Sequence, residues 1–358
     1  MIEKQISRVA ILIPTYNGSA FVDELLESIA NDSYLKEYLG IFVVDNASRD
    51  DTVARISNKA ISNISIIRNS CNEYFAKAIN QAANAAILSG YEYLILLNQD
   101  TTVEVGWIMA LQEALTTDSS IAAAQARMML FPAASITVNS LGNAIHYLGF
   151  GFSSCNGKQW ATVETGYAGA WWETFYASGG AMMIRASVWK QLGGLDEHLM
   201  MYHEDLALGW QLALQGKRSV CVRKAVVYHK YDFNPSPYKY YFMERNRLIV
   251  VLEYYKIATI LVLLPMLLSM EVGLLGFAFA KGWWKEKLRS YISIMTSLPI
   301  IIQKHRSIQS TRLVKDRTIL ARMAMTIEDQ PIDHWLLRTI GNPLMRWYYR
   351  MVMRIVWW

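Results

Sequence analysis

The sequence is poor in cysteine, and its three cysteines are not arranged to be joined. Among 358 residues, Cys71, Cys155 and Cys221 lie far apart and show neither CxxC nor zinc-site spacing. A disulfide framework and a structural zinc site are therefore not expected, and the cytosol is the natural compartment. The apolar run before Pro14 has only about six residues, which is too short for the apolar region of a signal peptide.

Two common nucleotide-binding signatures are also missing. No GxGxxG connects the first apolar run to the following helical segment, which argues against a dinucleotide fold, and no P-loop occurs. The chain shows no internal repeat and no low-complexity segment, so repeat architectures are excluded.

Positive charge is concentrated toward the C-terminus. Residues 281–358 hold 14 of the 35 Lys and Arg residues but only 5 of the 30 acidic residues. A basic segment favours an anionic surface, which is usually nucleic acid or membrane. Because this segment is also rich in apolar and aromatic residues, we expect a membrane surface and no nucleic acid.

The N-terminal part alternates between strand-like and helix-like patterns. Short apolar runs that predict buried strands lie at residues 8–14, 40–45, 64–68, 93–98 and 121–126. Helical patterns separate these runs, which predicts an α/β fold with βαβ units on a mainly parallel sheet. Residues 130–175 show no clear periodicity and are expected to form loops around a site. A strand-like run covers 174–185, and helices are expected in the second half of 188–216 and over 239–255.

Polar residues follow the predicted strands where the strands end. Thr15, Tyr16 and Asn17 follow the first strand, and Asp45 ends the second. Open α/β sheets collect ligands at this edge. The stretch LLNQD, ending at Asp100, has two interpretations: a turn or helix cap, or a ligand for a divalent cation that bridges a diphosphate.

The order of six short motifs resembles a known enzyme family. IPTYNG, VVDNASRDDT, NEYFAKAINQA, LLNQD, GGAMMIR and GGLDEHLMMYHEDLALGWQL follow one another within residues 8–250. This order resembles the family 2 inverting glycosyltransferases of the GT-A fold, and in particular rhamnosyltransferase-like and galactofuranosyltransferase-like members. The resemblance implies a GT-A domain over residues 1–250. The apolar and basic composition of residues 251–358 predicts a helical, membrane-associating region.

The resemblance also implies a binding site for a nucleoside diphosphate-sugar, with UDP- or dTDP-sugars favoured, and for Mg²⁺ or Mn²⁺. The cation would be held by Asp100 and by His229, and Asn98 replaces the first acid of the usual Asp-x-Asp element. The expected nucleotide-sugar contacts are Pro14, Thr15, Tyr16, Asn17, Asp45, Asn46, Asn72, Phe75, Asn98 and Gln99.

For catalysis, the resemblance points to the acidic pair in YHEDLALGW. Asp205 would be the base that takes a proton from the acceptor hydroxyl, and Glu204 would position the acceptor. Both residues are expected to begin a helix, where the helix dipole favours carboxylates. The expected acceptor contacts are Gly179, Gly180, His203 and Trp210.

The C-terminal region carries two membrane-type patterns. Residues 257–280 form an apolar run interrupted by Pro265 and Glu271, for which we favour a pair of helices in one leaflet over a full span. In the last residues, RWYYRMVMRIVWW places three arginines on one helical stripe beside aromatic side chains, which suits lipid headgroups or packing on the catalytic domain. Arg245 and Arg247 are expected to contact either the diphosphate or the membrane.

These patterns together predict a metal-dependent inverting glycosyltransferase on the cytoplasmic face of the cell membrane. Its acceptor would be a glycan or a lipid-linked sugar in surface polysaccharide or lipopolysaccharide assembly. Two alternatives stay open: transfer to polyprenyl phosphate, and a catalytically silent GT-A membrane scaffold. A processive synthase is not favoured, because no Gln-x-x-Arg-Trp motif and no row of membrane spans occur.

Overall fold

The computed structural model divides the chain into two compact units. It describes residues 7–32, 34, 36–59, 61, 63–132, 136–231, 236–327, 335 and 337–358. The first unit comprises Met1–Asn143, Ser153–Gly209 and Arg218–Tyr231, and the second comprises Ala144–Phe152, Trp210–Lys217 and Asp232–Trp358. The boundary predicted at residue 250 falls inside a helix, α8 (Pro237–Tyr254).

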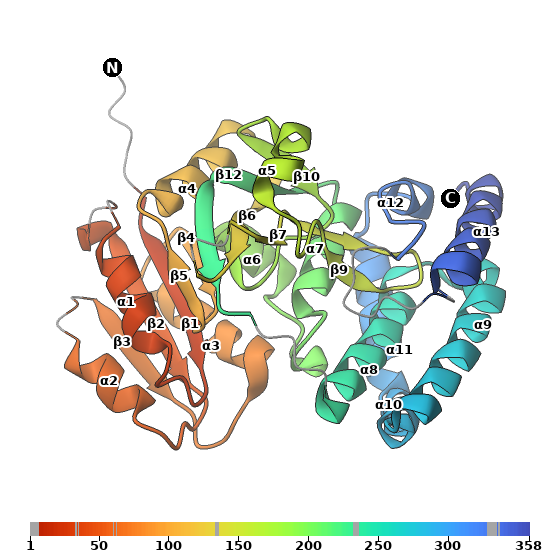
Figure 1. The fold of residues 1–358 in the computed structure, drawn as a ribbon, viewed down its shortest axis with the longest axis horizontal. Helices are drawn as coiled ribbons and strands as arrows, with labels where there is room; N and C mark the ends of the chain where they lie inside the picture. Colours follow the sequence, from red (N-terminus) through yellow and green to blue (C-terminus); the bar gives the residue numbers. More distant parts are fainter. Residues whose placement is uncertain are drawn as a thin grey trace. The chain divides into compact units, whose positions relative to one another are not determined.

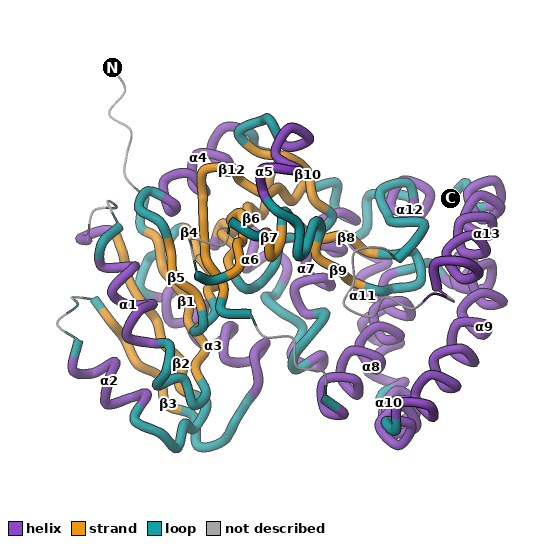
Figure 2. The backbone as a smooth tube through the Cα atoms, in the orientation of Figure 1, coloured by secondary structure: helices purple, strands orange, loops and turns teal. Residues whose placement is uncertain are grey.

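The first unit is built on one large, mostly parallel sheet (Figures 1 and 2). Its main strand order is β10-β12-β6-β11-β4-β1-β2-β3, with β5 paired to β12 and β7 paired to β6. Strands β10 and β11 run antiparallel to their neighbours. The strands are β1 (Val9–Thr15), β2 (Leu39–Asp45), β3 (Ile64–Arg68), β4 (Tyr93–Leu97), β5 (Thr101–Val103), β6 (Ile121–Leu130), β7 (Val138–Ser140), β10 (Trp171–Thr174), β11 (Ala181–Arg185) and β12 (Arg218–His229).

Helices cover both faces of this sheet, which explains the continuous apolar runs of its central strands. Side chains from α1 and α4 share one apolar cluster with Ile11 and Ile13 of β1, while α3 packs along β1 and β2 (Figure 1). Both residues of β1 are completely buried or nearly so. The helices are α1 (Val22–Ala30), α2 (Thr52–Asn58), α3 (Tyr74–Leu88), α4 (Trp107–Thr117), α5 (Trp160–Val163) and α6 (Ala186–Leu192).

One predicted strand is in fact two strands and a loop. The run 174–185 was expected to be continuous, but β10 ends at Thr174 and β11 begins at Ala181. The loop between them contains Gly179 and Gly180, and the Gly180 carbonyl accepts a hydrogen bond from the N–H of Asn98, which follows β4 (3.0 Å). Residues 130–175, expected to be loops, also contain β7 and a two-stranded sheet of β8 (Asn143–Ile145) and β9 (Gly151–Ser153).

Most of the second unit is helical. Its helices are α8, α9 (Ile257–Lys281), α10 (Trp284–Thr296), α11 (Leu298–Thr311), α12 (Asp316–Leu320) and α13 (Asn342–Ile355). The helix pair predicted for 257–280 is wrong, because α9 continues through Pro265 as one helix. Among the described residues, α9 is the one helix long and apolar enough to cross a membrane, by length and composition.

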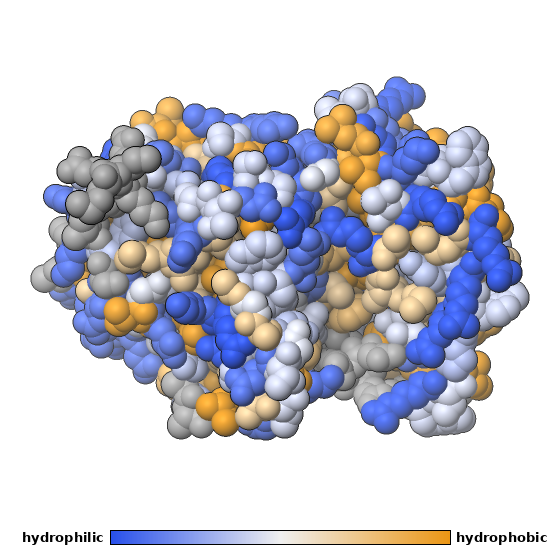
Figure 3. Space-filling view, turned by 90° about the horizontal axis from the view of Figure 1, so that it is seen from above, coloured by the Kyte–Doolittle hydropathy of each residue, from blue (hydrophilic) through white to orange (hydrophobic). Residues whose placement is uncertain are grey.

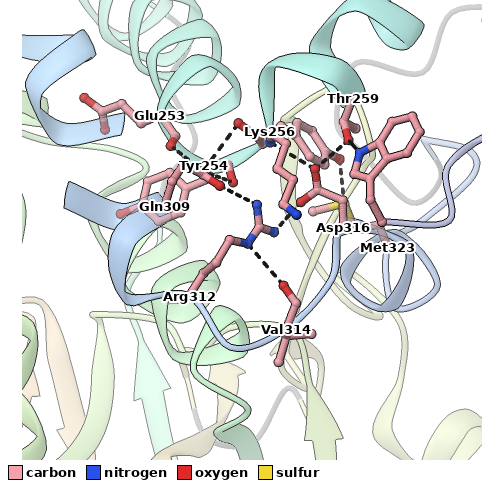
Figure 4. Close-up of polar contacts among 11 residues, drawn as sticks. Glu253, Tyr254, Lys256, Thr259, Gln309, Arg312, Val314, Asp316 and Met323 are labelled. Carbon is pink, nitrogen blue, oxygen red and sulfur yellow. Dashed lines mark hydrogen bonds and ion pairs between the residues drawn. The ribbon is translucent and has the colours of Figure 1, made fainter. Parts of the chain in front are cut away.

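The start of α9 is held by a buried carboxylate. Asp316 is completely buried and accepts hydrogen bonds from the Lys256 backbone (2.9 Å) and the Thr259 hydroxyl (2.5 Å) (Figure 4). Arg312 forms an ion pair with the other Asp316 oxygen. The Trp358 indole also donates to the Thr259 hydroxyl (2.8 Å). These contacts fix the first turn of α9 to α12 and to the C-terminal residue.

Candidate active site

The ends of β1, β2 and β4 are joined by hydrogen bonds. The Asn46 backbone N–H donates to the Thr15 carbonyl (2.8 Å). The Gln99 side chain pairs with the Tyr16 backbone in both directions, accepting from its N–H (3.0 Å) and donating to its carbonyl (3.2 Å). The Tyr16 residue is 43% exposed. An aromatic face therefore stands at the ligand edge of the sheet, on a backbone that Gln99 fixes.

The loop after β2 is hydrogen-bonded to the residues that follow β1. Asn17 has a left-handed backbone (φ 48°), and its side chain accepts from the Arg49 backbone (2.9 Å). Asp45 is buried and accepts from the Ser48 backbone (3.2 Å). Although burial favours the neutral acid at Asp50, hydrogen bonds from Thr52 and Ser19 hold the pKa of Asp50 at about 2.

Asn46 and Asn72 shape the entrance to α3. The Asn46 amide oxygen accepts from the Asn69 side chain (2.9 Å), and its nitrogen donates to the Tyr74 carbonyl (3.3 Å). Asn72 accepts from the Tyr74 N–H (2.9 Å), the pattern of an Asx turn. The two asparagines thus hold the first turn of the helix that carries Phe75. Asn69 and Asp50 were not among the predicted site residues.

The two predicted metal ligands lie together, although 128 positions separate Asp100 and His229 in the sequence. The pairing of β5 with β12 sets Thr101 opposite His229, and His229 Nε2 lies 3.2 Å from Asp100 Oδ1. On its other side, His229 Nδ1 lies 3.0 Å from Asn139 Oδ1. If Nδ1 carries the proton and donates to Asn139, Nε2 keeps its lone pair for a metal ion.

Asp100 and His229 suit a divalent cation that is also bound by the substrate. In the described part of the chain, no three His, Cys, Asp or Glu side chains are grouped as a metal site. Asp100 and His229 therefore offer two protein ligands. Mg²⁺ and Mn²⁺ take few carboxylates and complete their shell with water and phosphate oxygens. Asn98, whose backbone N–H donates to the Gly180 carbonyl (3.0 Å), adds no charge.

The predicted base begins helix α7 (Glu204–Leu214). Three residues before it, Met200, Tyr202 and His203, have positive φ angles of 62°, 63° and 70°, which is uncommon for residues with a Cβ. Such strained backbone clusters at functional sites. Asp205 Oδ2 accepts from the Gly179 N–H (3.0 Å), and Oδ1 accepts from the Leu206 N–H (2.7 Å).

The two adjacent carboxyl groups differ in how readily they ionise. Burial raises the pKa of Glu204 well above its ordinary value, and the neighbouring charge of Asp205 raises it further. Burial also raises the pKa of Asp205, but the backbone donors of Gly179 and Leu206 oppose this effect. Because the charge of Asp205 raises the pKa of Glu204, Asp205 is the carboxyl group that ionises first. One side chain can accept a proton while its neighbour donates a hydrogen bond.

The two glycines beside Asp205 lie close to neighbouring side chains. A Cβ at Gly179 would lie 3.2 Å from the Phe75 ring and 3.6 Å from Asp205 Cβ. A Cβ at Gly180 would lie 3.0 Å from Met128 Cε and 3.4 Å from the Asn98 amide nitrogen. The loop thus places Phe75, Asn98 and Asp205 around one backbone segment.

Trp210, which was predicted to contact the acceptor, is a buried residue. It belongs to the second unit, and its ring packs on those of Tyr254 and Tyr255, with centroid distances of 5.4 and 4.8 Å. Its exposed fraction is 0%, so the side chain has no surface to offer an acceptor. Four residues of helix α7 separate Trp210 from Asp205, and the periodicity of a helix alone could not show that Trp210 is internal.

A family model and several solved structures match the chain. The model of glycosyl transferase family 2 matches residues 10–193, just over half of the chain. The chain therefore belongs to glycosyl transferase family 2 and is a glycosyltransferase. The comparison with curated proteins found no match.

Three of the similar structures illustrate the fold. GalNAc-T7 with UDP, GalNAc and Mn²⁺ has a TM-score of 0.58 at 16% identity. The match covers 71% of this chain but only about half (49%) of the GalNAc-T7 chain. S. aureus TarS 1–349 has a TM-score of 0.52 at 16% identity, covering 97% of this chain and 90% of that one. The mannosyltransferase PcManGT from Pyrobaculum calidifontis, with GDP-Man and Mn²⁺, has a TM-score of 0.50 at 14% identity, covering 97% and 86%. The fold is GT-A-like, as the sequence predicted.

Proposed function

We propose that this glycosyltransferase moves a sugar from a nucleoside diphosphate-sugar to an acceptor hydroxyl with inversion, using Mg²⁺ or Mn²⁺. The proposal rests on two carboxylates of the first unit. Asp100 lies beside His229, and Asp205 accepts a hydrogen bond from the backbone N–H of Gly179. The similar structures support such a donor, since TarS is described with UDP-GlcNAc and PcManGT with GDP-Man and Mn²⁺.

Asp205 is the proposed general base. Its carboxylate takes the proton of the acceptor hydroxyl while that oxygen forms a bond to the anomeric carbon and the bond to the diphosphate breaks. A pKa raised by burial makes the carboxylate a stronger base than an exposed aspartate. Glu204 stays protonated and donates a hydrogen bond to a sugar oxygen.

The residues around Asp100 hold the leaving group. A bound divalent cation supplies positive charge that stabilises the departing diphosphate. Asp100 and His229 would hold this ion, and Asn139 orients the His229 ring. Because Asn98 stands in place of an acid, Asp100 would be the carboxylate that this element supplies to the ion. At the nucleoside end of the donor, the exposed Tyr16 side chain stacks on the nucleobase, and Asp45 and Asn46 bind the ribose.

The finer assignments follow the family resemblance. We propose a UDP- or dTDP-sugar as donor and a rhamnosyltransferase-like or galactofuranosyltransferase-like specificity. The acceptor is a growing glycan or lipid-linked sugar in surface polysaccharide or lipopolysaccharide assembly on the cytoplasmic face of the membrane. Transfer to polyprenyl phosphate is the second candidate, and the apolar surface of α9 favours it as well.

Nucleotide release tests the proposal. The full-length protein is assayed with UDP-, dTDP- and GDP-sugars, each with Mn²⁺, Mg²⁺ or a chelator, and with glycan or polyprenyl phosphate acceptors. Turnover with one donor that requires the cation supports the proposal. Donor binding without turnover for every pair of donor and acceptor would contradict it and favour the silent scaffold.

A further inference from the structure

The exposed side of α9 is apolar along the whole helix. Ile257, Leu261, Leu264, Leu268, Val272 and Phe279 are between 40% and 74% exposed. They recur at intervals of three, four and seven residues, which places them on one side of the helix. We call these six residues the α9 stripe. Exposed apolar patches of this extent mark interaction sites.

The charge within α9 is turned away from solvent and neutralised. Glu271 pairs with Arg247 of α8 and with Lys287 of α10 (2.7 Å), and it accepts from the Tyr291 hydroxyl (2.7 Å). Glu244 of α8 pairs with the same two cations. This network of two acids and two bases explains why a carboxylate is tolerated in an apolar helix. The prediction that Arg247 contacts a diphosphate or the membrane is wrong, because its side chain is 1% exposed.

The same network restrains α9 within its unit. Burial favours the neutral acid, but Arg247 and Lys287 outweigh this effect and hold the pKa of Glu271 below its ordinary value. A helix that left the unit to cross a bilayer would take Glu271 with it and leave Arg247 and Lys287 with a single carboxylate. The first turn is tied to Asp316 (Figure 4), and the helix ends at Gly282 in a left-handed turn (φ 79°) that leads into α10.

Positive charge is exposed on the helix next to α9. Helix α13 runs next to α9 (Figure 1), and the Tyr348 hydroxyl donates to the Val262 carbonyl (2.6 Å). Arg346, Arg350 and Arg354 are exposed along α13, and Trp347 is 61% exposed among them. Figure 3 shows hydrophilic and hydrophobic residues side by side over the face that it draws. An apolar stripe on one helix, with arginine and tryptophan exposed on the neighbouring helix, matches the boundary between acyl chains and anionic headgroups.

We infer that α9 and α13 form a monotopic docking surface for one leaflet of an anionic phospholipid membrane, with α9 lying in the plane of the leaflet. The α9 stripe enters the acyl region, while Arg350 and Arg354 bind headgroup phosphates. The inference rests on the proposed membrane-associated function, but its test needs neither donor nor acceptor. A failure of membrane docking is therefore distinguishable from a failure of catalysis.

Vesicle flotation of the full-length protein tests separately what the α13 arginines and the apolar α9 stripe contribute to membrane binding. Arg350→Gln with Arg354→Gln should weaken binding to phosphatidylcholine–phosphatidylglycerol vesicles roughly 30-fold, at the usual contribution of a basic residue near an anionic surface. The matched control, Lys190→Gln with Lys224→Gln, removes two exposed charges of the first unit and should change nothing. Leu268→Gln with Val272→Gln should abolish binding. Circular dichroism and nucleotide binding establish that each variant is folded.

A labelling experiment distinguishes lying in the leaflet from crossing it. Ala258→Cys and Lys281→Cys place single thiols at the exposed ends of α9, in a background with Cys71→Ser and Cys155→Ser. An impermeant maleimide added outside the vesicles should label both positions. Labelling of only one end would show a span and overturn the inference. So would failure of the wild type to float with anionic vesicles, or a lipid-free dimer that the stripe substitutions dissociate.

Discussion

Exchanging the two adjacent acids one at a time tests whether Asp205 is the base. Asp205→Asn removes a proton acceptor but keeps the size of the side chain. One amide oxygen can still accept a backbone hydrogen bond, from Gly179 or from Leu206, while the amide nitrogen faces the other donor. We expect kcat to fall by about 10²- to 10⁴-fold, the usual contribution of a general base, while the dissociation constant for the nucleotide stays within about threefold.

Glu204→Gln is the matched control, because it changes the neighbouring acid that we propose to be protonated. A glutamine reproduces the shape and the hydrogen-bond donor of a protonated glutamate. We therefore expect kcat to fall less than about fivefold, which corresponds to about 1 kcal/mol. If Glu204 were instead ionised in the active enzyme, its removal would also lower the pKa of Asp205.

The pH dependence gives an independent readout. The base works only when ionised, so activity is lost as the pH falls through the pKa of Asp205. Since burial raises that pKa, the acid limb of the kcat profile should lie above the ordinary aspartate value of 3.8. Glu204→Gln should leave this limb in place. A large loss in Glu204→Gln with a mild effect of Asp205→Asn would refute the reasoning, and so would equal slow turnover in both.

Three further variants test other parts of the structure. Asn139→Ala should weaken activation by Mn²⁺ roughly 10- to 100-fold, because it removes the partner of the His229 Nδ1 atom; a Mn²⁺ titration of donor binding measures the shift. Glu271→Gln should lower the free energy of unfolding by about 3 kcal/mol, since it leaves two buried cations with one carboxylate; urea denaturation measures it. Gly209→Ala should destabilise by about 1–3 kcal/mol or prevent folding, because its Cβ would lie 2.8 Å from the Tyr176 Cα.

Each of these variants has a matched control in the same chain. Asn156→Ala changes another asparagine of the first unit and should leave the Mn²⁺ titration unchanged. Glu286→Gln, on α10, alters a glutamate with no ion pair among the salt bridges of the described residues and should cost less than about 0.5 kcal/mol. Gly273→Ala lies in a helix with no atom within 4 Å of the new Cβ, and it should stabilise by about 0.5–1 kcal/mol. Equal effects in variant and control would contradict the corresponding prediction.

The sequence by itself determined the parts that depend on short-range pattern. Runs such as residues 8–14 and 93–98 predicted strands, because a strand covered on both faces must be apolar throughout. Their polar ends predicted the ligand edge of the sheet, because parallel strands bring these ends to one side. The six motifs gave the family, which the family model confirms.

Only the tertiary structure decided which distant residues meet. The family resemblance implied that Asp100 and His229 share a cation, but the pairing of β5 with β12 that joins them, and the contact with Asn139, have no local signal in the sequence. Glu271 is costly in an apolar run on its own, and only the packed chain supplies Arg247 and Lys287 as its partners. Burial and pairing are properties of the packed chain, whereas periodicity reports only how each segment is divided between apolar and polar faces.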